Sequence, residues 1–385
     1  MTEVIAPADA GECARTLAAA AGARRTVRIE GAGTKAYIGD GVATDAVLST
    51  RLLAGIVDHV PADLTVTVRG GTAMSAVQRA LHATGQFLPL DPPRADRATI
   101  GGIVAANSNG FGRLRYGGVR DVLIGTTVAL ADGTLARAGG RVVKNVAGYD
   151  LNKLFTGSLG TLGVIVEATL KVLPLPRAAA VAEVRVARAA DAFHLADLLL
   201  RTSLRPTALV VDGDGGSWRL LVAAAGERPV VERAMRDAAR RAEEMGAVVE
   251  RSEDPDALLA PLRDMASWAR HGAVVRAALP LAATGAYAES AARSDAVSRV
   301  VADAGSGIVR VHARGDESGV IAAADALLAA ARIVGGSAQV ERREPALRSR
   351  LRAWPGPPPG AALMRRIKEA FDPNAILEPG RSPIG

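Results

Sequence analysis

The sequence has very little cysteine and few aromatic side chains. Cys13 is the single cysteine among 385 residues. The chain therefore has no internal disulfide and cannot by itself supply a four-cysteine iron–sulfur cluster or a zinc site built on cysteine. Phe, Trp and Tyr make up only 3% of the residues, so the apolar content rests mainly on Ala, Val, Leu and Ile. This composition fits the strands and short helices of a globular protein.

Long apolar runs are also missing. No stretch of about 18 uncharged apolar residues occurs, which predicts no transmembrane helix. The first residues, MTEVIAPADAGE, lack the basic-then-apolar order of a signal peptide. We therefore expect a cytoplasmic protein that would reach a membrane only through partners.

The net charge of +7 is scattered along the chain. Even the arginine-rich stretch 342–352 contains Glu344 and follows Glu341. This distribution argues against nucleic-acid binding and suits anionic substrates or an acidic partner. A helical HExxH pair, a P-loop and a GxSxG elbow are absent from the sequence, and no cluster of acidic residues has useful spacing, so no metal is predicted.

Hydrophobic periodicity predicts an α+β chain, and the order of the expected strands and helices changes near Pro174 and Pro176. Before this point we expect strands at 26–30, 65–69 and 161–173, a helix capped by Thr72, and a hairpin of 121–130 with 134–138. Beyond it, strands at 207–211, 218–224 and 307–313 alternate with helices such as 229–245. A last helix, carrying Leu363, Ile367 and Phe371 at helical spacing, ends at Asp372.

Small residues are concentrated in three segments before the boundary. The first follows the expected strand 26–30 and consists of Gly31, Ala32, Gly33, Thr34 and Lys35. A Rossmann fingerprint needs a helix directly afterwards, but further glycines follow too soon for one. We expect a tight loop whose N–H groups point into a concavity and bind phosphate. The alternative interpretation is an ordinary glycine-rich turn.

The other two segments have the same character. The second offers close backbone approach and hydrogen-bonding side chains through Asp91, Thr99, Gly101, Gly102, Asn107 and Ser108. The third surrounds a strand entry with Gly157, Gly160, Thr161, Gly163, Val164 and Ile165. Three such segments in one domain predict an extended, phosphate-bearing ligand held between sheets, although each could also be a structural loop.

Four motifs in this order resemble the FAD-linked 2-hydroxy-acid oxidoreductases of the vanillyl-alcohol-oxidase type. They are GAGTK from Gly31, ATIGGIVAANSNGFGRLRYGG from Ala98, VVKNVAGYDLNKLFTGSLGTLGVIVEATLKVLP from Val142, and MRRIKEAFDPNAILEPGR from Met364. The resemblance covers about residues 25–177 and 364–381, and the middle of the chain is diverged. Residues 144–151 and 160–178 resemble in particular the FAD-binding subunits of bacterial glycolate oxidases.

The resemblance implies an α+β fold: a PCMH-type FAD-binding domain of two subdomains at 1–176, an α+β cap domain at 177–345, and a C-terminal helix and tail at 346–385 that return to the FAD domain. It places the FAD pyrophosphate at Gly31–Lys35 and Thr99–Gly102, and the adenosine half along Gly157–Ile165. Family members that attach FAD covalently often use a histidine near these segments. None is present there, so we expect non-covalent FAD.

Catalytic residues cannot be assigned from the sequence. Oxidation of a 2-hydroxy acid needs a base for the hydroxyl proton and a cation for the carboxylate. Competent family members have clustered cap histidines and a His-Gly motif before the last helix, whereas this chain has neither. The isolated His312 shares an expected strand face with Arg310 and Arg314, which could also be a solvated basic face.

The leading hypothesis is an FAD-binding subunit of a glycolate oxidase complex that converts glycolate to glyoxylate without a full catalytic set of its own. The resemblance implies two partners, a homologous catalytic FAD subunit and an iron–sulfur subunit. The alternative is a stand-alone FAD-dependent dehydrogenase for glycolate or D-lactate. A third interpretation, a scaffold that has lost flavin, fits poorly with the three intact small-residue segments.

Overall fold

The chain divides into two units in the computed structural model, which describes residues 2–140, 150–268 and 271–385. The first unit contains Met1–Asn109, Gly117–Leu175 and Gly356–Gly385, and the second contains Gly110–Tyr116 and Pro176–Pro355. Both mix helices and sheets, so the predicted α+β class is confirmed. Two details differ from the predicted domain limits: residues 110–116 join the second unit, and the chain returns to the first unit at Gly356 instead of residue 346.

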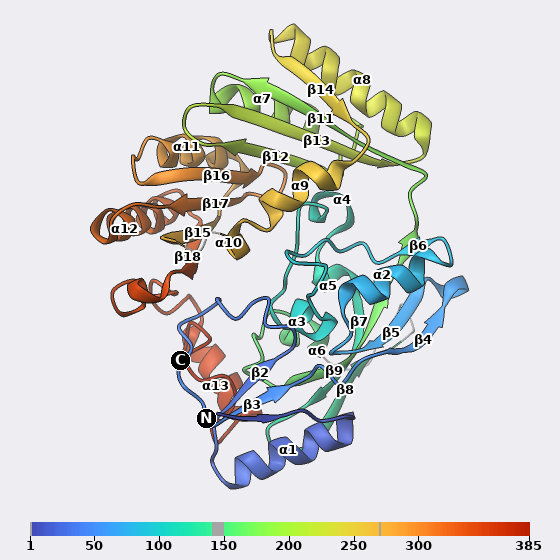
Figure 1. Ribbon diagram of the computed structural model, residues 1–385, viewed down its shortest axis with the longest axis vertical. Helices are drawn as coiled ribbons and strands as arrows, with labels where there is room; N and C mark the ends of the chain where they lie inside the picture. Colours follow the sequence, from blue (N-terminus) through green and yellow to red (C-terminus); the bar gives the residue numbers. More distant parts are fainter. Residues whose placement is uncertain (1, 141–149, 269–270) are drawn as a thin grey trace. The chain divides into compact units, whose positions relative to one another are not determined.

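Two sheets form the frame of the first unit (Figure 1). A parallel three-stranded sheet has the order β1 (Glu3–Ile5), β3 (Ala46–Ser49), β2 (Val27–Glu30). An antiparallel five-stranded sheet has the order β4 (Ile56–Val60), β5 (Thr65–Arg69), β9 (Val164–Lys171), β7 (Leu123–Ala129), β8 (Leu135–Gly139). A short antiparallel pair joins β6 (Gln86–Phe87) to β10 (Leu173–Pro174).

Helices cover these sheets and bury small aliphatic cores against them. They are α1 (Ala10–Gly22), η1 (Pro61–Asp63), α2 (Met74–His82), α3 (Ile100–Ala105), α5 (Val119–Val122), α6 (Leu151–Phe155) and α13 (Ala361–Phe371). Met74, Val77 and Leu81 of α2 are buried, as their spacing predicts. The expected cap at Thr72 is wrong: Ala73 is the N-cap, and the Thr72 hydroxyl instead lies 2.6 Å from the Arg69 carbonyl.

The second unit repeats one arrangement twice around an eight-stranded antiparallel sheet. The first copy runs β11 (Ala178–Val186), α7 (Ala189–Leu200), β12 (Ala208–Gly213), β13 (Trp218–Gly226), α8 (Arg228–Glu244), β14 (Val248–Ser252). The second copy runs β15 (Ala273–Ala278), α11 (Leu281–Ala292), β16 (Val297–Asp303), β17 (Ile308–Ala313), α12 (Glu317–Ile333), β18 (Ser337–Arg343). Each copy is a split β-α-β motif, and β12 pairs with β16 to join them.

The strand order of the sheet is β14-β11-β13-β12-β16-β17-β15-β18. The two copies therefore occupy the two halves of the sheet and meet at β12 and β16. Short elements complete the unit: α4 (Arg113–Tyr116), α9 (Pro255–Arg263), α10 (Met265–Trp268) and η2 (Pro345–Ser349). Hydrophobic periodicity along the sequence does not reveal this duplication, which becomes visible only in the order of the elements and the pairing of the strands.

The two faces of the eight-stranded sheet differ in polarity. Side chains alternate between faces along a strand: Ala182 and Val184 of β11 enter the apolar core with α7, α8, α11 and α12, while Glu183 and Arg185 face the other way. We call this other side the charged face; it carries Glu183, Arg185, Asp212, Arg219, Glu250, Arg276, Arg299, Arg310 and Glu341.

Candidate functional site

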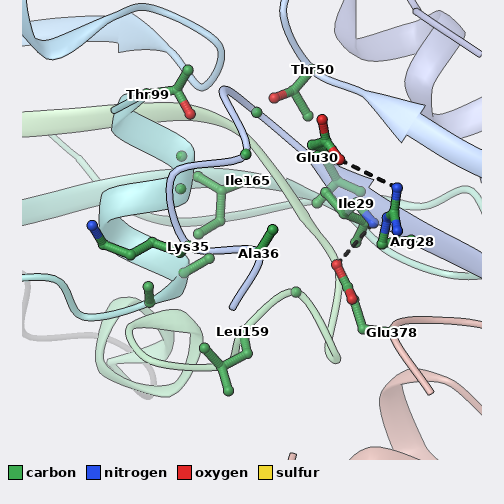
Figure 2. Close-up of a pocket in the computed structure, with 18 of the residues that line it drawn as sticks. Arg28, Ile29, Glu30, Lys35, Ala36, Thr50, Thr99, Leu159, Ile165 and Glu378 are labelled. Carbon is green, nitrogen blue, oxygen red and sulfur yellow. Dashed lines mark hydrogen bonds and ion pairs between the residues drawn. The ribbon is translucent and has the colours of Figure 1, made fainter. Parts of the chain in front are cut away.

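A pocket in the first unit brings together residues that are far apart in the sequence (Figure 2). The volume of the pocket is about 740 Å³, and part of this volume is open to solvent. The lining comes from the loop after β2, the start of α3, the segment before β9, and the C-terminal tail. The lining residues are Arg28–Ala36, Thr50, Thr99, Gly101, Gly102, Ala105, Ala106, Leu159, Gly160, Gly163–Ile165, Glu378 and Arg381.

The loop after β2 has the form expected from the sequence. No helix follows it, and Gly33 adopts a φ of +70° that favours glycine. Within the described chain, the backbone N–H groups of Ala32, Gly33 and Thr34 have no hydrogen-bond acceptor. Because these donors line a pocket, the loop is a backbone nest suited to an anionic ligand such as phosphate.

Gly31 and Lys35 fix the two ends of this loop. A Cβ atom on Gly31 would lie 2.2 Å from the Thr99 hydroxyl oxygen, so only glycine fits there. The Lys35 ammonium donates to the Pro93 carbonyl at 2.9 Å, which ties the loop to the segment that contains Asp91. Lys35 therefore also shapes the pocket, and Asp91 itself does not line it.

Two adjacent glycines in α3 have different surroundings. A Cβ on Gly101 would lie 2.9 Å from the Gly70 carbonyl oxygen and 3.0 Å from that of Ile165, so close packing of the backbone requires glycine. A Cβ on Gly102 would meet only the Thr99 hydroxyl, at 3.1 Å. Gly102 therefore keeps space open in the pocket, whereas Gly101 serves the packing of the fold.

The segment before β9 provides the opposite wall. Gly160 (φ +83°) and Gly163 (φ +150°) need the conformational freedom of glycine. A Cβ on Gly160 would lie 3.2 Å from the Ile29 side chain and 3.3 Å from that of Glu378. Val164 and Ile165 begin β9 and close the wall with apolar surface.

Five predicted contact residues do not line the pocket: Asp91, Asn107, Ser108, Gly157 and Thr161. Some of them shape the loops around it. The carbonyl of Asn107 (φ +45°) accepts a hydrogen bond from the Asn109 amide, and the Thr161 hydroxyl donates to the Ser158 carbonyl at 2.7 Å. Most of the KNVAGYDL motif lies outside the described residues.

The C-terminal tail supplies two charged lining residues that the sequence analysis missed. The Glu378 carboxyl accepts a hydrogen bond from the Ile29 N–H at 2.8 Å, and the Arg381 guanidinium donates to the Lys35 carbonyl at 2.7 Å. Burial raises the pKa of Glu378, and the neighbouring Arg381 opposes this shift. Their only sequence signal was the closing motif itself, which predicted the return of the tail but not its side-chain contacts.

Lys368 anchors the tail next to the pocket. Its ammonium donates to the Thr161 carbonyl at 2.9 Å, to the Leu377 carbonyl at 2.9 Å, and to the buried Asp372 carboxylate at 2.5 Å. Asp372 in turn accepts the N–H groups of Ile376 and Leu377. This network fixes the start of the tail against the loop that carries Gly160.

Histidine chemistry has no support from the geometry of His312. One ring nitrogen lies 2.9 Å from the Ser298 hydroxyl and the other lies 2.9 Å from the His271 carbonyl. Burial lowers the pKa of His312, so the neutral ring is favoured. Both nitrogens are thus engaged, and the structural interpretation of this residue is the better one.

Matches to known families agree with this site. Residues 2–139 match the FAD binding domain, and residues 356–382 match the C-terminal domain of FAD linked oxidases. The chain therefore carries an FAD-binding domain of the FAD-linked oxidase type, with FAD as its cofactor. In the described part of the chain, no helix is long and apolar enough to cross a membrane.

Similar curated proteins include two glycolate oxidase subunits. The chain is 45% identical over 151 residues to glycolate oxidase subunit GlcE of Escherichia coli (strain K12), a match that covers 39% of this chain and 43% of that protein. It is 39% identical over 175 residues to glycolate oxidase subunit GlcD of Bacillus subtilis (strain 168), covering 45% of this chain and 37% of that protein. The chain thus matches less than half the length of these relatives.

Solved structures share the fold over nearly the whole chain. An alkyldihydroxyacetonephosphate synthase superposes with a TM-score of 0.76 at 16% identity, covering 98% of this chain and 75% of that one. A p-cresol methylhydroxylase superposes with a TM-score of 0.75 at 16% identity, covering 99% and 88%. These likenesses support the PCMH-type α+β fold.

Proposed function

We propose that this chain is the counterpart of the E subunit of bacterial glycolate oxidase. It would bind FAD within a complex that oxidises glycolate to glyoxylate, beside a homologous catalytic FAD subunit and an iron–sulfur subunit. The observation that carries the proposal is the pocket in which the backbone N–H groups of Ala32, Gly33 and Thr34 have no acceptor within the described chain and could bind an anion. This pocket lies in a domain that is similar in sequence to GlcE. The single cysteine is consistent with a separate iron–sulfur subunit.

The pocket suggests how this chain would hold FAD. The nest at Gly31–Lys35, with Thr99 to Gly102 beside it, would bind the pyrophosphate, and the wall from Gly157 to Ile165 would contact the adenosine half. When bound, FAD supplies a hydride acceptor for alcohol oxidation. The chain's own residues bind and orient the cofactor through backbone donors and small side chains.

Non-covalent attachment is part of the proposal. Among the described residues that line the pocket, none is a histidine or cysteine. Acid precipitation should leave the flavin in the supernatant, as absorbance at the flavin band would show. Flavin in the washed pellet would contradict this attachment mode.

Two neighbouring glycines test the placement of the pyrophosphate. Gly102→Val adds bulk in the pocket and only one neighbour within van der Waals distance, so we expect a folded protein without flavin. Gly101→Val is the matched control, because its side chain would meet two backbone carbonyls and destabilise the fold by about 1–3 kcal/mol. A Gly102→Val protein with normal flavin content would refute the placement.

The division of labour is tested by anaerobic reduction. The purified chain should show an oxidised flavin spectrum that glycolate and D-lactate leave unchanged, because His312 is engaged in structural hydrogen bonds. Co-expression with the two proposed partner subunits should give a stable complex on gel filtration. Elution of this chain as an active monomer, in their presence, would reject the subunit role.

One observation favours the alternative, a stand-alone 2-hydroxy-acid dehydrogenase. Arg276 of β15 lies directly opposite Arg310 of β17 on the charged face, and Arg113 is close enough to repel it. Glu341 binds Arg310 at 2.7 Å, but Arg276 has no hydrogen bond or ion pair within the described residues. Such a cation could bind the carboxylate of a hydroxy acid. Rapid bleaching of the isolated chain by glycolate, lost in Arg276→Met, would establish this alternative.

A further inference from the structure

The C-terminal tail places a carboxyl group inside the cofactor pocket, beside Ile29 and Gly160. Figure 2 shows Glu378 and Leu159 on one side of the pocket and Thr99 on the opposite side. The side chain of Glu378 lies at Gly160 and Ile29, whereas Gly31, at the start of the nest, lies next to Thr99. The end of the nest reaches the tail, where Arg381 donates to the Lys35 carbonyl. A dinucleotide whose phosphates occupy the nest would place one of its two halves along the wall at Gly160, which Glu378 contacts.

Glu378 is held in place and still has acceptor capacity. It adopts a φ of +48°, unusual for a residue other than glycine, and only 4% of its surface is exposed. One carboxyl oxygen accepts from the Ile29 N–H at 2.8 Å, and the other lies 3.4 Å from the Arg381 guanidinium. A carboxylate offers about four lone-pair positions, so it can accept further hydrogen bonds from a ligand.

The chemistry of a carboxyl acceptor limits what it can recognise. The phosphate groups of a dinucleotide are anions without donors at neutral pH and would be repelled by it. Ribose hydroxyls and the adenine amino group are donors that a carboxylate accepts well. Glu378 therefore suits a nucleoside and is unsuited to the pyrophosphate.

The burial of the pocket around Glu378 indicates which half of FAD, adenosine or flavin, would lie there. An isoalloxazine ring must exchange electrons with a substrate or a partner, which requires an accessible edge or close approach. The end of the pocket at Glu378 is closed by the tail, where Gly380 and Pro379 accept backbone hydrogen bonds from Gly41 and Val42. A closed end suits the adenosine half, which has no part in electron transfer.

The neighbouring Arg381 adds a second indication of a ligand at this end. It lines the pocket, and its Nε is buried without a hydrogen-bond acceptor in the described chain. A buried donor without an acceptor costs free energy unless a ligand or water satisfies it. Glu378 and Arg381 thus bring an acceptor and a donor to one end of the pocket.

We propose that Glu378 of the C-terminal tail binds the adenosine half of FAD and makes the chain select FAD over FMN. The inference rests on the proposed FAD site and adds a specificity-determining residue outside the small-residue segments. Lys368 and Asp372 act as positioning residues, because they fix the tail that carries Glu378.

The test compares two flavins and two phosphate probes on one set of apoproteins. Flavin fluorescence quenching gives the Kd of FAD and of FMN, and competition with FAD gives those of ADP and inorganic pyrophosphate. For Glu378→Ala we expect roughly 10- to 100-fold weaker binding of FAD and ADP, the equivalent of losing hydrogen bonds to a charged group. FMN and pyrophosphate, which lack adenosine, should keep their affinities within about twofold.

A matched control and a milder variant keep the test decisive. Glu369→Ala removes an exposed acid from α13 of the same segment and should change none of the four affinities. If Glu378→Ala does not fold, as judged by circular dichroism, Glu378→Gln retains an acceptor for the Ile29 N–H. It should still weaken FAD and ADP selectively, because its amide nitrogen cannot accept.

The outcomes separate this inference from the proposed function. A wild-type chain that binds no FAD would reject the FAD site itself. A chain that binds FAD and FMN equally, or a Glu378 variant that weakens both flavins to the same extent or neither, would overturn the assignment of Glu378 while leaving the FAD site in place.

Discussion

The two copies within the second unit share a topology but distribute charge differently. In the first copy, Arg185 lies directly opposite Arg219 on neighbouring strands. In the second copy, Arg276 lies directly opposite Arg310 in the corresponding strands. Two arginines face one another in both copies, so the difference between them lies in the carboxylates that surround each pair.

The first copy compensates its arginines completely. Glu183 lies 3.0 Å from Arg185 and 3.3 Å from Arg219. Asp212 lies 2.8 Å from both Arg219 and Arg299. Glu250 lies 3.2 Å from Arg185. Each arginine of this set therefore has a carboxylate within 3.3 Å, although like charges stand directly opposite one another in the strand register.

The second copy lacks this balance. Glu341 binds Arg310 and is the one carboxylate that raises the pKa of Arg276. Burial, followed by repulsion from Arg310, lowers the pKa of Arg276 to about 10, so it stays protonated at neutral pH. An incompletely compensated cation costs stability. This difference between the copies is the reason that Arg276 carries the alternative function proposed above.

The comparison predicts the largest loss of stability for Asp212→Ala in the first copy. The carboxylate is 4% exposed and shared by two arginines. Its removal would take the carboxylate partner from Arg299 and leave Arg219 with Glu183 alone, at 3.3 Å. We expect a cost of about 3 kcal/mol or more. Urea denaturation would measure the change in the free energy of unfolding. Asp197→Ala, in an exposed pair with Arg201, is the control and should cost far less, because solvent screens the pair.

Arg276→Met should act in the opposite direction in the second copy. Methionine fills similar volume without a charge that must be desolvated, so we expect unchanged stability or a gain of about 1 kcal/mol. Arg219→Met in the first copy is the matched variant. This substitution removes one of the cationic partners of Asp212 and of Glu183, so it should destabilise the protein in the same denaturation experiment. Equal losses from both substitutions would show that the two copies do not differ energetically.

A carboxylate should distinguish the two copies as well. Acetate is the simplest probe, and it should stabilise the wild type by about 0.4 kcal/mol when its concentration equals its Kd. Thermal unfolding in acetate and in chloride of equal ionic strength would separate specific binding from screening. Arg276→Met should lose the acetate-specific shift, whereas Arg185→Met should keep it. A shift that survives in Arg276→Met would place the anion elsewhere.

The strands and helices that carry strong periodicity were predictable from the sequence, and the duplication was not. The expected strands at 65–69 and 218–224 and the helix at 229–245 correspond closely to β5, β13 and α8. The relation between the copies depends on which strands pair, and alternation of apolar and polar residues does not encode pairing partners. The Arg276–Arg310 juxtaposition follows from that pairing and was invisible for the same reason.

The pocket shows a similar limit. Its small-residue walls at Gly31–Lys35, Thr99–Gly102 and Gly160–Ile165 were found because a close backbone approach requires glycine. Asn107 and Ser108 belong to the same dense run, but the turn after α3 directs them away from the lining. Glu378 was missed because its entry depends on a left-handed backbone that glutamate rarely adopts.

The smallest effect is expected at the rim of the first copy, for Glu250→Gln. Its carboxylate lies 3.2 Å from Arg185, but both side chains are more than half exposed, at 59% and 57%. Solvent screens such a pair, and Arg185 keeps Glu183 as a partner, so the loss should stay below about 0.5 kcal/mol. The same denaturation series would measure it. A cost near that of Asp212→Ala would mean that the charges of the first copy act as one cooperative network. The stability would then depend on keeping every charged residue of this network more than on how deeply each one is buried.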